Sequence, residues 1–230
     1  MPRLKAIPPA RILFDVTNFR RDDSDVATIV FIGDSITDCE RRDLHAPYGD
    51  GYMNMVRTSV MDRTAGAQPT WVNRGISGNT VLDLAARWRD DAIGTHPTWL
   101  SVMIGINDVW RAFDGHPEDA VPLEVFEPTL RGLLTDAVEA TGARLILADP
   151  YIIEPDRDEP QRVATDAFAV AVRRLADEFD AVHVPTQSAF DRVLTSTTPD
   201  AWSQDRIHPN PAGHRLIADE FLRAIGDRWS

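Results

Sequence analysis

Ser35 follows a short apolar run, in the stretch of residues 31–40 that reads FIGDSITDCE. A serine hydroxyl can attack an ester carbonyl when a base takes its proton and when hydrogen-bond donors stabilise the oxyanion that forms. Gly-Asp-Ser is also ordinary turn chemistry, because Asp and Ser side chains bond nearby backbone amides. Ser35 is therefore a candidate nucleophile only if the rest of the chain supplies the base and the donors.

The chain offers both. His208 is the candidate base, because imidazole titrates near neutral pH, and Asp205, which stands three residues earlier, can hold its other ring nitrogen. Gly78 offers a backbone amide without a side chain to obstruct a substrate, and Asn107 offers a side-chain amide. Together with the amide of Ser35, these groups would form an oxyanion hole with three donors.

The elements that must position these residues follow an α/β pattern with a mostly parallel sheet, because short β-rich runs alternate with longer segments of helical periodicity. The expected strands are residues 27–32, 69–73, 98–104, 144–149 and 181–185. The expected helices are residues 52–63, 81–93, 125–141, 161–179, 187–194 and 211–228. Ligands of open parallel sheets bind beyond the carboxyl ends of the strands, so the polar loops after the first strands should meet at one edge.

Length and charge limit the number of domains and the classes of partner that the chain can have. The chain has 230 residues, 43% of them hydrophobic, and it contains no Gly/Ser linker or internal repeat, which favours one domain with one substantial core. Its net charge of −12 argues against a nucleic-acid partner and against an anionic membrane, both of which require clustered Lys and Arg. A small neutral or cationic substrate fits this composition better.

The compartment is predicted from features that the sequence lacks. The N-terminal stretch contains no apolar run typical of a signal sequence, and no segment reads as a transmembrane helix. The single cysteine, Cys39, excludes an intramolecular disulfide framework and suits a reducing cytoplasm. Cys39 itself is expected to be a small buried side chain rather than a reactive thiol.

Four short blocks carry a family resemblance: GDSIT, ISGNT, GIND and DRIHP, in this order along the chain. They resemble the blocks of the SGNH hydrolases, also called the GDSL esterases, with Ile36 in place of the usual Leu. The resemblance implies a three-layer α/β/α sandwich around a mostly parallel, five-stranded sheet, as in the flavodoxin-like fold. It also implies a catalytic triad of Ser35, Asp205 and His208, and an oxyanion hole of Ser35, Gly78 and Asn107.

A closer resemblance covers residues 31–229, where NRGISGNTVLDLAARW, MIGINDVWR and HPNPAGH look like the acetyl xylan esterase branch of this family. That branch removes acetyl groups from xylan fragments, so the resemblance implies an oligosaccharide ester as substrate and no cofactor. Together with late aromatic residues such as Trp229, it also raises the expectation of a homo-oligomer. Gln204 departs from the branch, which often has an aromatic residue directly before the triad aspartate. Residues 1–26 are expected to be an extension of unknown role, before a hydrolase domain at residues 27–230.

Several alternatives stay open at this level. The same fold also serves lysophospholipases and thioesterases, and a non-catalytic carbohydrate-binding relative is a third reading. Trp110 is a candidate sugar-stacking residue or an ordinary core tryptophan, and Asp34 is expected to anchor the turn before Ser35. A metal site at Asp205, His208 and His214 is disfavoured, because His214 falls inside the last expected helix and no second acidic cluster accompanies it.

Overall fold

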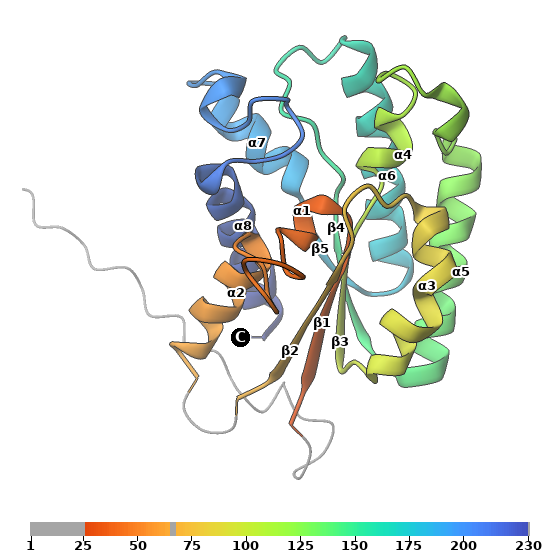
Figure 1. The fold of residues 1–230 in the computed structure, drawn as a ribbon, viewed down its shortest axis with the longest axis vertical. Helices are drawn as coiled ribbons and strands as arrows, with labels where there is room; N and C mark the ends of the chain where they lie inside the picture. The colour runs from red at the N-terminus through yellow and green to blue at the C-terminus, as the bar shows by residue number, and fades with distance from the viewer. Residues whose placement is uncertain (1–25, 65–67, 230) are drawn as a thin grey trace, which may run out of the picture.

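The fold is a five-stranded parallel sheet between two layers of helices (Figure 1). The structure is a computed structural model and describes residues 26–64 and 68–229, with side chains up to residue 226. The strands are β1 (Thr28–Gly33), β2 (Thr70–Gly75), β3 (Trp99–Met103), β4 (Arg144–Ala148) and β5 (Val182–Val184), in the spatial order β2-β1-β3-β4-β5. Each neighbouring pair runs parallel, so the expected α/β fold is confirmed.

The main helices lie where their periodicity predicts them. They are α2 (Tyr52–Met61), α3 (Val81–Asp91), α5 (Leu123–Thr141), α6 (Pro160–Glu178), α7 (Thr186–Leu194) and α8 (Pro211–Trp229), with short 3₁₀ turns η2 (Ile93–Thr95), η3 (Pro117–Asp119) and η4 (Pro199–Ala201). Two further short helices, α1 (Ser35–Asp38) and α4 (Ile106–Trp110), occupy segments that we expected to be loops. Both expectations were wrong in the same way, because each segment turns into a helix as soon as its strand ends.

Strand β1 shows how the sequence builds two cores at once. Successive side chains of a strand point to opposite faces of the sheet. Ile29 and Phe31 accordingly belong to one buried cluster, whereas Val30 and Ile32 belong to the other. A strand buried on both faces needs a continuous apolar run, and residues 27–32 provide one.

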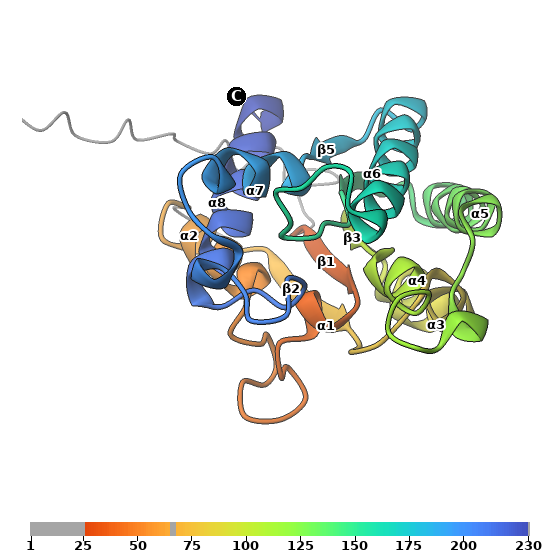
Figure 2. The ribbon, with the colours of Figure 1, turned by 90° about the horizontal axis from the view of Figure 1, so that it is seen from above.

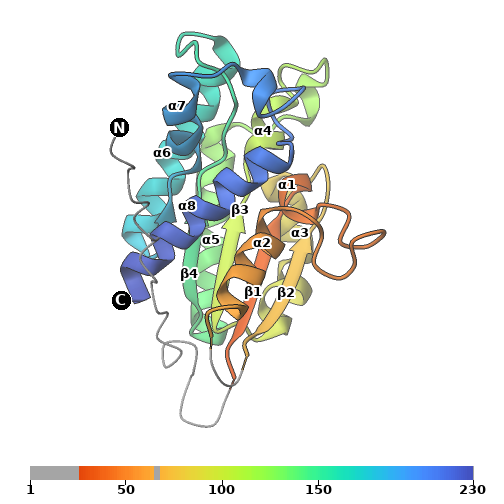
Figure 3. The ribbon, with the colours of Figure 1, turned by 90° about the vertical axis from the view of Figure 1, so that its left-hand side faces the viewer.

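The helices divide between these two cores. On one side, α2 and α8 pack next to each other, with α7 beside α8 (Figures 1 and 3). On the other side, α3, α5 and α6 cover the opposite face of the sheet (Figure 1). Phe31 contacts Tyr52 of α2 and Phe221 of α8, with ring centroids 6.0 and 5.8 Å away. These aromatic contacts pack β1, the strand that precedes Ser35, against the layer of α2 and α8.

The order of the strands decides which loops meet. Because β1 lies between β2 and β3, the segments that follow these three strands emerge side by side at the carboxyl edge. Figure 2 looks onto this edge, with α1 at the end of β1.

Some expectations fall outside the described residues. The N-terminal extension does so except for its last residue, and so does the side chain of Trp229. Within the part of the chain that is described, no helix combines the length and apolar character needed to span a bilayer.

Candidate active site

Ser35 is the first residue of α1, directly beyond the end of β1. Asp34 caps this helix: its Oδ1 accepts a hydrogen bond from the Ile36 amide at 3.0 Å. The backbone oxygen of Asp34 also accepts from the Asp38 amide at 2.9 Å. Asp34 therefore has the turn-anchoring role that its position in the sequence predicts, and it holds the backbone that presents the serine hydroxyl.

A chain of hydrogen bonds links Ser35 to His208 and Asp205. The Oγ of Ser35 lies 2.9 Å from Nε2 of His208, and Nδ1 of His208 lies 2.7 Å from Oδ2 of Asp205. An ionised carboxylate only accepts hydrogen bonds, so Nδ1 carries a hydrogen. In the neutral imidazole the lone pair of Nε2 then faces the serine hydroxyl. The structure thus brings together three residues that stand up to 173 positions apart in sequence.

The Asp205 carboxylate has the environment of a permanently charged group. Its Oδ1 accepts from the Ser203 hydroxyl and from the amides of Ile207 and His208, at 2.9, 3.0 and 2.8 Å. Partial burial opposes ionisation, but the hydrogen bonds from His208, Ile207 and Ser203 outweigh it and hold the pKa of Asp205 well below its usual range. Asp205 is therefore ionised across the pH range in which His208 would act.

Besides the Ser35 amide, the candidate oxyanion donors lie in the segments that follow β2 and β3, the two strands next to β1. Gly78, in the loop after β2, has a φ of +81°, a conformation that glycine adopts without strain. Asn107 lies on α4, after β3, rather than in the loop that we expected, and it is only 2% exposed. Its Nδ2 donates to the backbone oxygen of Asn79 at 3.0 Å, so one amide hydrogen fixes the side chain and the other stays available.

Trp110 lies at the other end of α4, beside His208. The centroids of the two rings are 6.1 Å apart at an interplanar angle of 78°, an edge-to-face contact. The Trp110 side chain is half-buried and packs against the apolar cluster that includes Phe31. Its contact with His208 puts it next to the reacting groups, and its role in binding sugar stays a prediction.

The similarity to known proteins agrees with this geometry. Residues 31–216 match the GDSL-like lipase/acylhydrolase family. The chain belongs to this family. It is also 41% identical over 211 residues to the acetylxylan esterase of Geobacillus stearothermophilus, covering 87% of this chain and 94% of that protein. The family and this relative identify the chain as a carboxylic ester hydrolase.

Two further relatives show how far the similarity extends. The crystal structure of Axe2, an acetylxylan esterase from G. stearothermophilus, superposes with a TM-score of 0.84 at 40% identity, over 88% of this chain and 95% of Axe2. Thioesterase 1/protease 1/lysophospholipase L1 of Escherichia coli K12 is 26% identical over 198 residues, which is 86% of this chain and 83% of that protein. Solved catalytic mutants of Axe2 replace a serine, an aspartate or a histidine by alanine, and the last two stand three positions apart.

Within this GDSL hydrolase, sequence reasoning missed the polar residues that hold the site loops. Asp38, at the end of α1, accepts from the amide of Ser77 at 3.0 Å and from its hydroxyl at 3.1 Å. Asn73 donates from Nδ2 to the Thr37 oxygen at 2.7 Å and accepts from the Gly75 amide at 2.8 Å. The available signals were a polar residue inside β2, Asn73, and an acidic residue three positions after the candidate nucleophile, Asp38. Such residues usually serve the loops around them.

Two buried carboxyl groups adjoin the site residues in sequence. Burial raises the pKa of Asp34 to about 7, against the opposing hydrogen bond from the Ile36 amide. Burial likewise raises the pKa of Asp108, next to Asn107, to about 7, although its Oδ1 accepts from the Val81 amide at 3.0 Å. Near neutral pH both groups therefore exist partly as neutral acids, and each accepts a hydrogen bond from a backbone amide that it holds in place.

Cys39 and His214 form a separate contact. The Sγ of Cys39 lies 3.5 Å from Nε2 of His214 and donates to the Ile36 oxygen at 3.2 Å. Burial raises the pKa of the Cys39 thiol to about 12 and lowers that of His214 to about 4, so both are neutral at pH 7. Nδ1 of His214 accepts from the Tyr52 amide at 3.3 Å, which engages its second nitrogen in packing.

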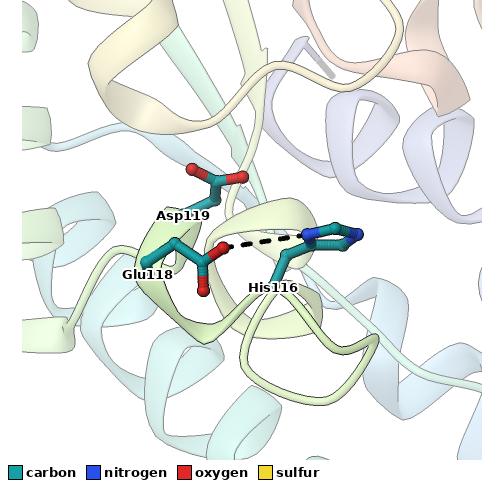
Figure 4. Close-up of side chains that lie close together, drawn as sticks. All are labelled: His116, Glu118 and Asp119. Atoms are coloured by element: carbon teal, nitrogen blue, oxygen red, sulfur yellow. Dashed lines mark ion pairs between the residues drawn. The ribbon is translucent and has the colours of Figure 1, made fainter.

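One cluster of potential metal ligands occurs elsewhere among the described residues. His116, Glu118 and Asp119 lie together in the segment of η3, where the His116 ring and the Glu118 carboxylate are 3.9 Å apart (Figure 4). All three side chains are exposed. Exposed acidic groups gather in this way without a metal, so we assign no ion to them.

Proposed function

We propose that the protein is a serine esterase that removes acetyl groups from carbohydrate, with acetylated xylo-oligosaccharides as its substrates. The observation that carries the proposal is the chain of contacts from Ser35 through His208 to Asp205, at 2.9 and 2.7 Å. The similarity to acetylxylan esterases supports the acetyl group and the sugar.

In the proposed reaction, Ser35 Oγ attacks the ester carbonyl while His208 Nε2 takes its proton. Asp205 holds the ring and stabilises its charged form. The tetrahedral oxyanion accepts hydrogen bonds from the Ser35 and Gly78 amides and from the Asn107 side chain. His208 then returns the proton to the departing sugar hydroxyl, which leaves an acetyl group on Ser35. Water attacks this acyl-enzyme with His208 again as base, and acetate leaves.

Trp110 has a proposed place in the same reaction. Its ring lies against His208, where the leaving sugar must receive its proton, and an aromatic face can pack on the apolar face of a sugar ring. We therefore assign Trp110 to substrate binding rather than to bond cleavage. Its truncation to Ala should raise KM for an acetylated sugar more than KM for phenyl acetate.

A second candidate is a lysophospholipase or thioesterase, which the similarity to the E. coli enzyme favours. Acyl-chain profiling with purified protein distinguishes the two. The acetyl-sugar proposal requires a steep fall in kcat/KM from acetyl to octanoyl esters, together with release of acetate from acetylated xylo-oligosaccharides. Preference for octanoyl esters with no acetate release supports the second candidate. A third reading, a non-catalytic carbohydrate-binding protein, requires that neither ester type is turned over.

The cytoplasm is our proposal for the compartment. It rests on the single cysteine, whose thiol packs against His214 and engages no disulfide. Fractionation of the source cells, with detection by antibody, tests it.

A further inference from the structure

Arg87 donates hydrogen bonds to three segments around the candidate active site, although the sequence did not mark it as a site residue. It lies on α3, and its side chain is 15% exposed. Its Nη2 donates to the oxygen of Gly33 at 3.0 Å and its Nη1 to the oxygen of Arg74 at 2.7 Å. Its Nε donates to Oδ1 of Asn79 at 2.7 Å. One guanidinium thus joins the ends of β1 and β2 to the loop that carries Gly78.

The geometry of arginine suits this arrangement. A guanidinium is planar and always charged, and it presents its donors in a fixed fork, whereas a lysine offers one compact ammonium. Asp91, one turn further along α3, forms an ion pair with Arg87, its carboxylate oxygen lying 2.8 Å from Nη1. The positions of the three acceptors relative to one another are therefore set by one rigid group.

Two of the residues that accept from Arg87 make further hydrogen bonds to the segments that carry the oxyanion donors. The oxygen of Gly33, two residues before Ser35, also accepts from the Ile76 amide at 3.0 Å, which ties the loop after β2 to the end of β1. The backbone oxygen of Asn79 accepts from Nδ2 of Asn107 at 3.0 Å. Arg87 therefore holds the residue whose carbonyl orients the Asn107 amide. It also holds the backbone that leads into Ser35.

We propose that Arg87 is a positioning residue of the oxyanion hole: through Asn79 it holds the Asn107 donor in place relative to the Ser35 and Gly78 amides. Oxyanion stabilisation depends on donors that are aligned before the charge develops, and small misplacements cost large factors in rate. Arg87 contacts none of the reacting groups, so it acts through Asn79 and Asn107. The inference rests on the oxyanion role proposed above for these donors and goes beyond it in naming the group that aligns them.

The test compares Arg87→Met, Arg87→Lys and wild type with phenyl acetate as substrate, each variant being checked for native circular dichroism. We expect kcat of Arg87→Met to fall roughly 10- to 100-fold while KM stays within about threefold. Arg87→Lys should recover part of this loss, because it restores the charge and one donor. If Arg87→Met does not fold, Asn79→Ala removes the acceptor of Nε and should show the same split between kcat and KM.

Two controls separate positioning from stability. Asp91→Asn removes the ion pair but leaves the three donor contacts of Arg87, so its kcat should stay within about threefold of wild type. Arg162 is a more deeply buried arginine, with its side chain 1% exposed, that donates to the Glu154 oxygen and binds Asp191. Arg162→Met should lower Tm while kcat of the folded protein stays within about twofold of wild type.

A double-mutant cycle decides whether Arg87 acts through Asn107. In an Asn107→Ala background, Arg87→Met should cost less than about threefold in kcat, because the donor that it aligns is already absent. The same fold-loss in both backgrounds, or kcat of Arg87→Met within twofold of wild type, would overturn the inference. Asn107→Ala with an unchanged kcat would overturn the oxyanion role and this inference together. Loss of kcat in Asn107→Ala but not in Arg87→Met removes only the inference about Arg87.

Discussion

Among the described residues, two Asp–His pairs are closely hydrogen-bonded, and they are connected in opposite ways. In the first, Asp205 binds Nδ1 of His208 at 2.7 Å and leaves the outer nitrogen, Nε2, facing Ser35. In the second, Asp149 binds Nε2 of His183 at 2.6 Å and leaves only Nδ1, the nitrogen nearer the backbone. An Asp–His pair is therefore no sign of catalysis until the free ring nitrogen is shown to face a nucleophile.

The surroundings of the second pair also differ. Asp149 follows β4 and His183 lies on β5, so this pair sits at the edge of the sheet away from β1. It borders a cleft of about 390 Å³ that is also lined by Ser188 and Gln187. Among the hydrogen bonds of the described residues, none joins Ser188 to His183. The second region thus has a base and a hydroxyl, but no hydrogen bond between them among the described residues.

The two carboxylates have opposite pKa shifts for reasons that their burial explains. Burial raises the pKa of Asp149, although the hydrogen bond from His183 opposes the shift. Asp205 is about half exposed, so its hydrogen bonds prevail and lower its pKa. The lowered pKa keeps Asp205 charged, so it can stabilise a transient imidazolium on His208.

The largest expected effect separates the two hydroxyls. Ser35→Ala should lower kcat for phenyl acetate by about 10⁴-fold or more, because it removes the proposed nucleophile. Ser188→Ala, the matched change in the second region, should leave kcat within about twofold of wild type. Steady-state kinetics on proteins with matched Tm values provide the measurement. Near-normal turnover by folded Ser35→Ala would contradict the assignment.

The next effect separates the two carboxylates. Asp205→Asn should lower kcat by roughly 10²- to 10⁴-fold, because an amide cannot stabilise the His208 imidazolium or fix its tautomer. Asp149→Asn should leave kcat within about threefold and change mainly Tm. If both variants lost activity equally, the two pairs would not differ in function, and the comparison would fail.

A third test compares one side-chain amide from each region. Asn107→Ala should lower kcat by roughly 10²- to 10³-fold with a smaller change in KM, because its amide donates chiefly to the developing oxyanion. Gln187, whose amide bonds both the N–H and the oxygen of Ile152, is the matched residue. Gln187→Ala should reduce stability and spare kcat. An Asn107→Ala enzyme with intact kcat and raised KM would make Asn107 a ground-state binding residue.

The smallest effect is on the pH dependence of stability. The native pKa of Asp205 lies below its unfolded value of 3.8, so its contribution to stability is present above that pH and disappears on acidification. The native pKa of Asp149 lies above 3.8, so its contribution is present at low pH and disappears as pH rises. The free energy of unfolding, measured with urea at several pH values, should therefore depend on pH differently in the two variants. Asp205→Asn and Asp149→Asn should change the slope of this free energy against pH with opposite signs. Shifts of the same sign would contradict the assigned pKa directions.

The sequence predicted much of the framework, for identifiable reasons. Strands β1 and β3 are mostly apolar runs, interrupted only by Thr28 and Ser101, and α8 begins at Pro211, a residue suited to a first helical turn. The blocks GDSIT and DRIHP also contain Ser35, Asp205 and His208, which the structure joins by hydrogen bonds. Strand β5 is one residue shorter at each end than expected, Val182–Val184 alone, and Pro185 already caps α7.

The features that the sequence did not predict depend on a local backbone conformation or on contacts between segments far apart in the chain. Helix α4 was missed because Gly105 precedes it at a φ of +123°, and a glycine at that place also reads as a loop. Arg87 looks like an ordinary surface arginine on the amphipathic pattern of α3, and its acceptors lie on three other segments. Asp149 and His183 are 34 residues apart in the sequence, and no motif predicted that they would pair.

The most direct test of the account is to trap the acyl-enzyme. Wild type and Ser35→Ala are mixed with excess phenyl acetate, quenched in acid within the first turnovers, digested and analysed by mass spectrometry. We predict an acetyl group on the wild-type peptide that contains Ser35, a matching burst of phenol, and neither signal in Ser35→Ala. An acetyl group on a peptide of the second region, or full turnover of phenyl acetate by Ser35→Ala, would contradict the account.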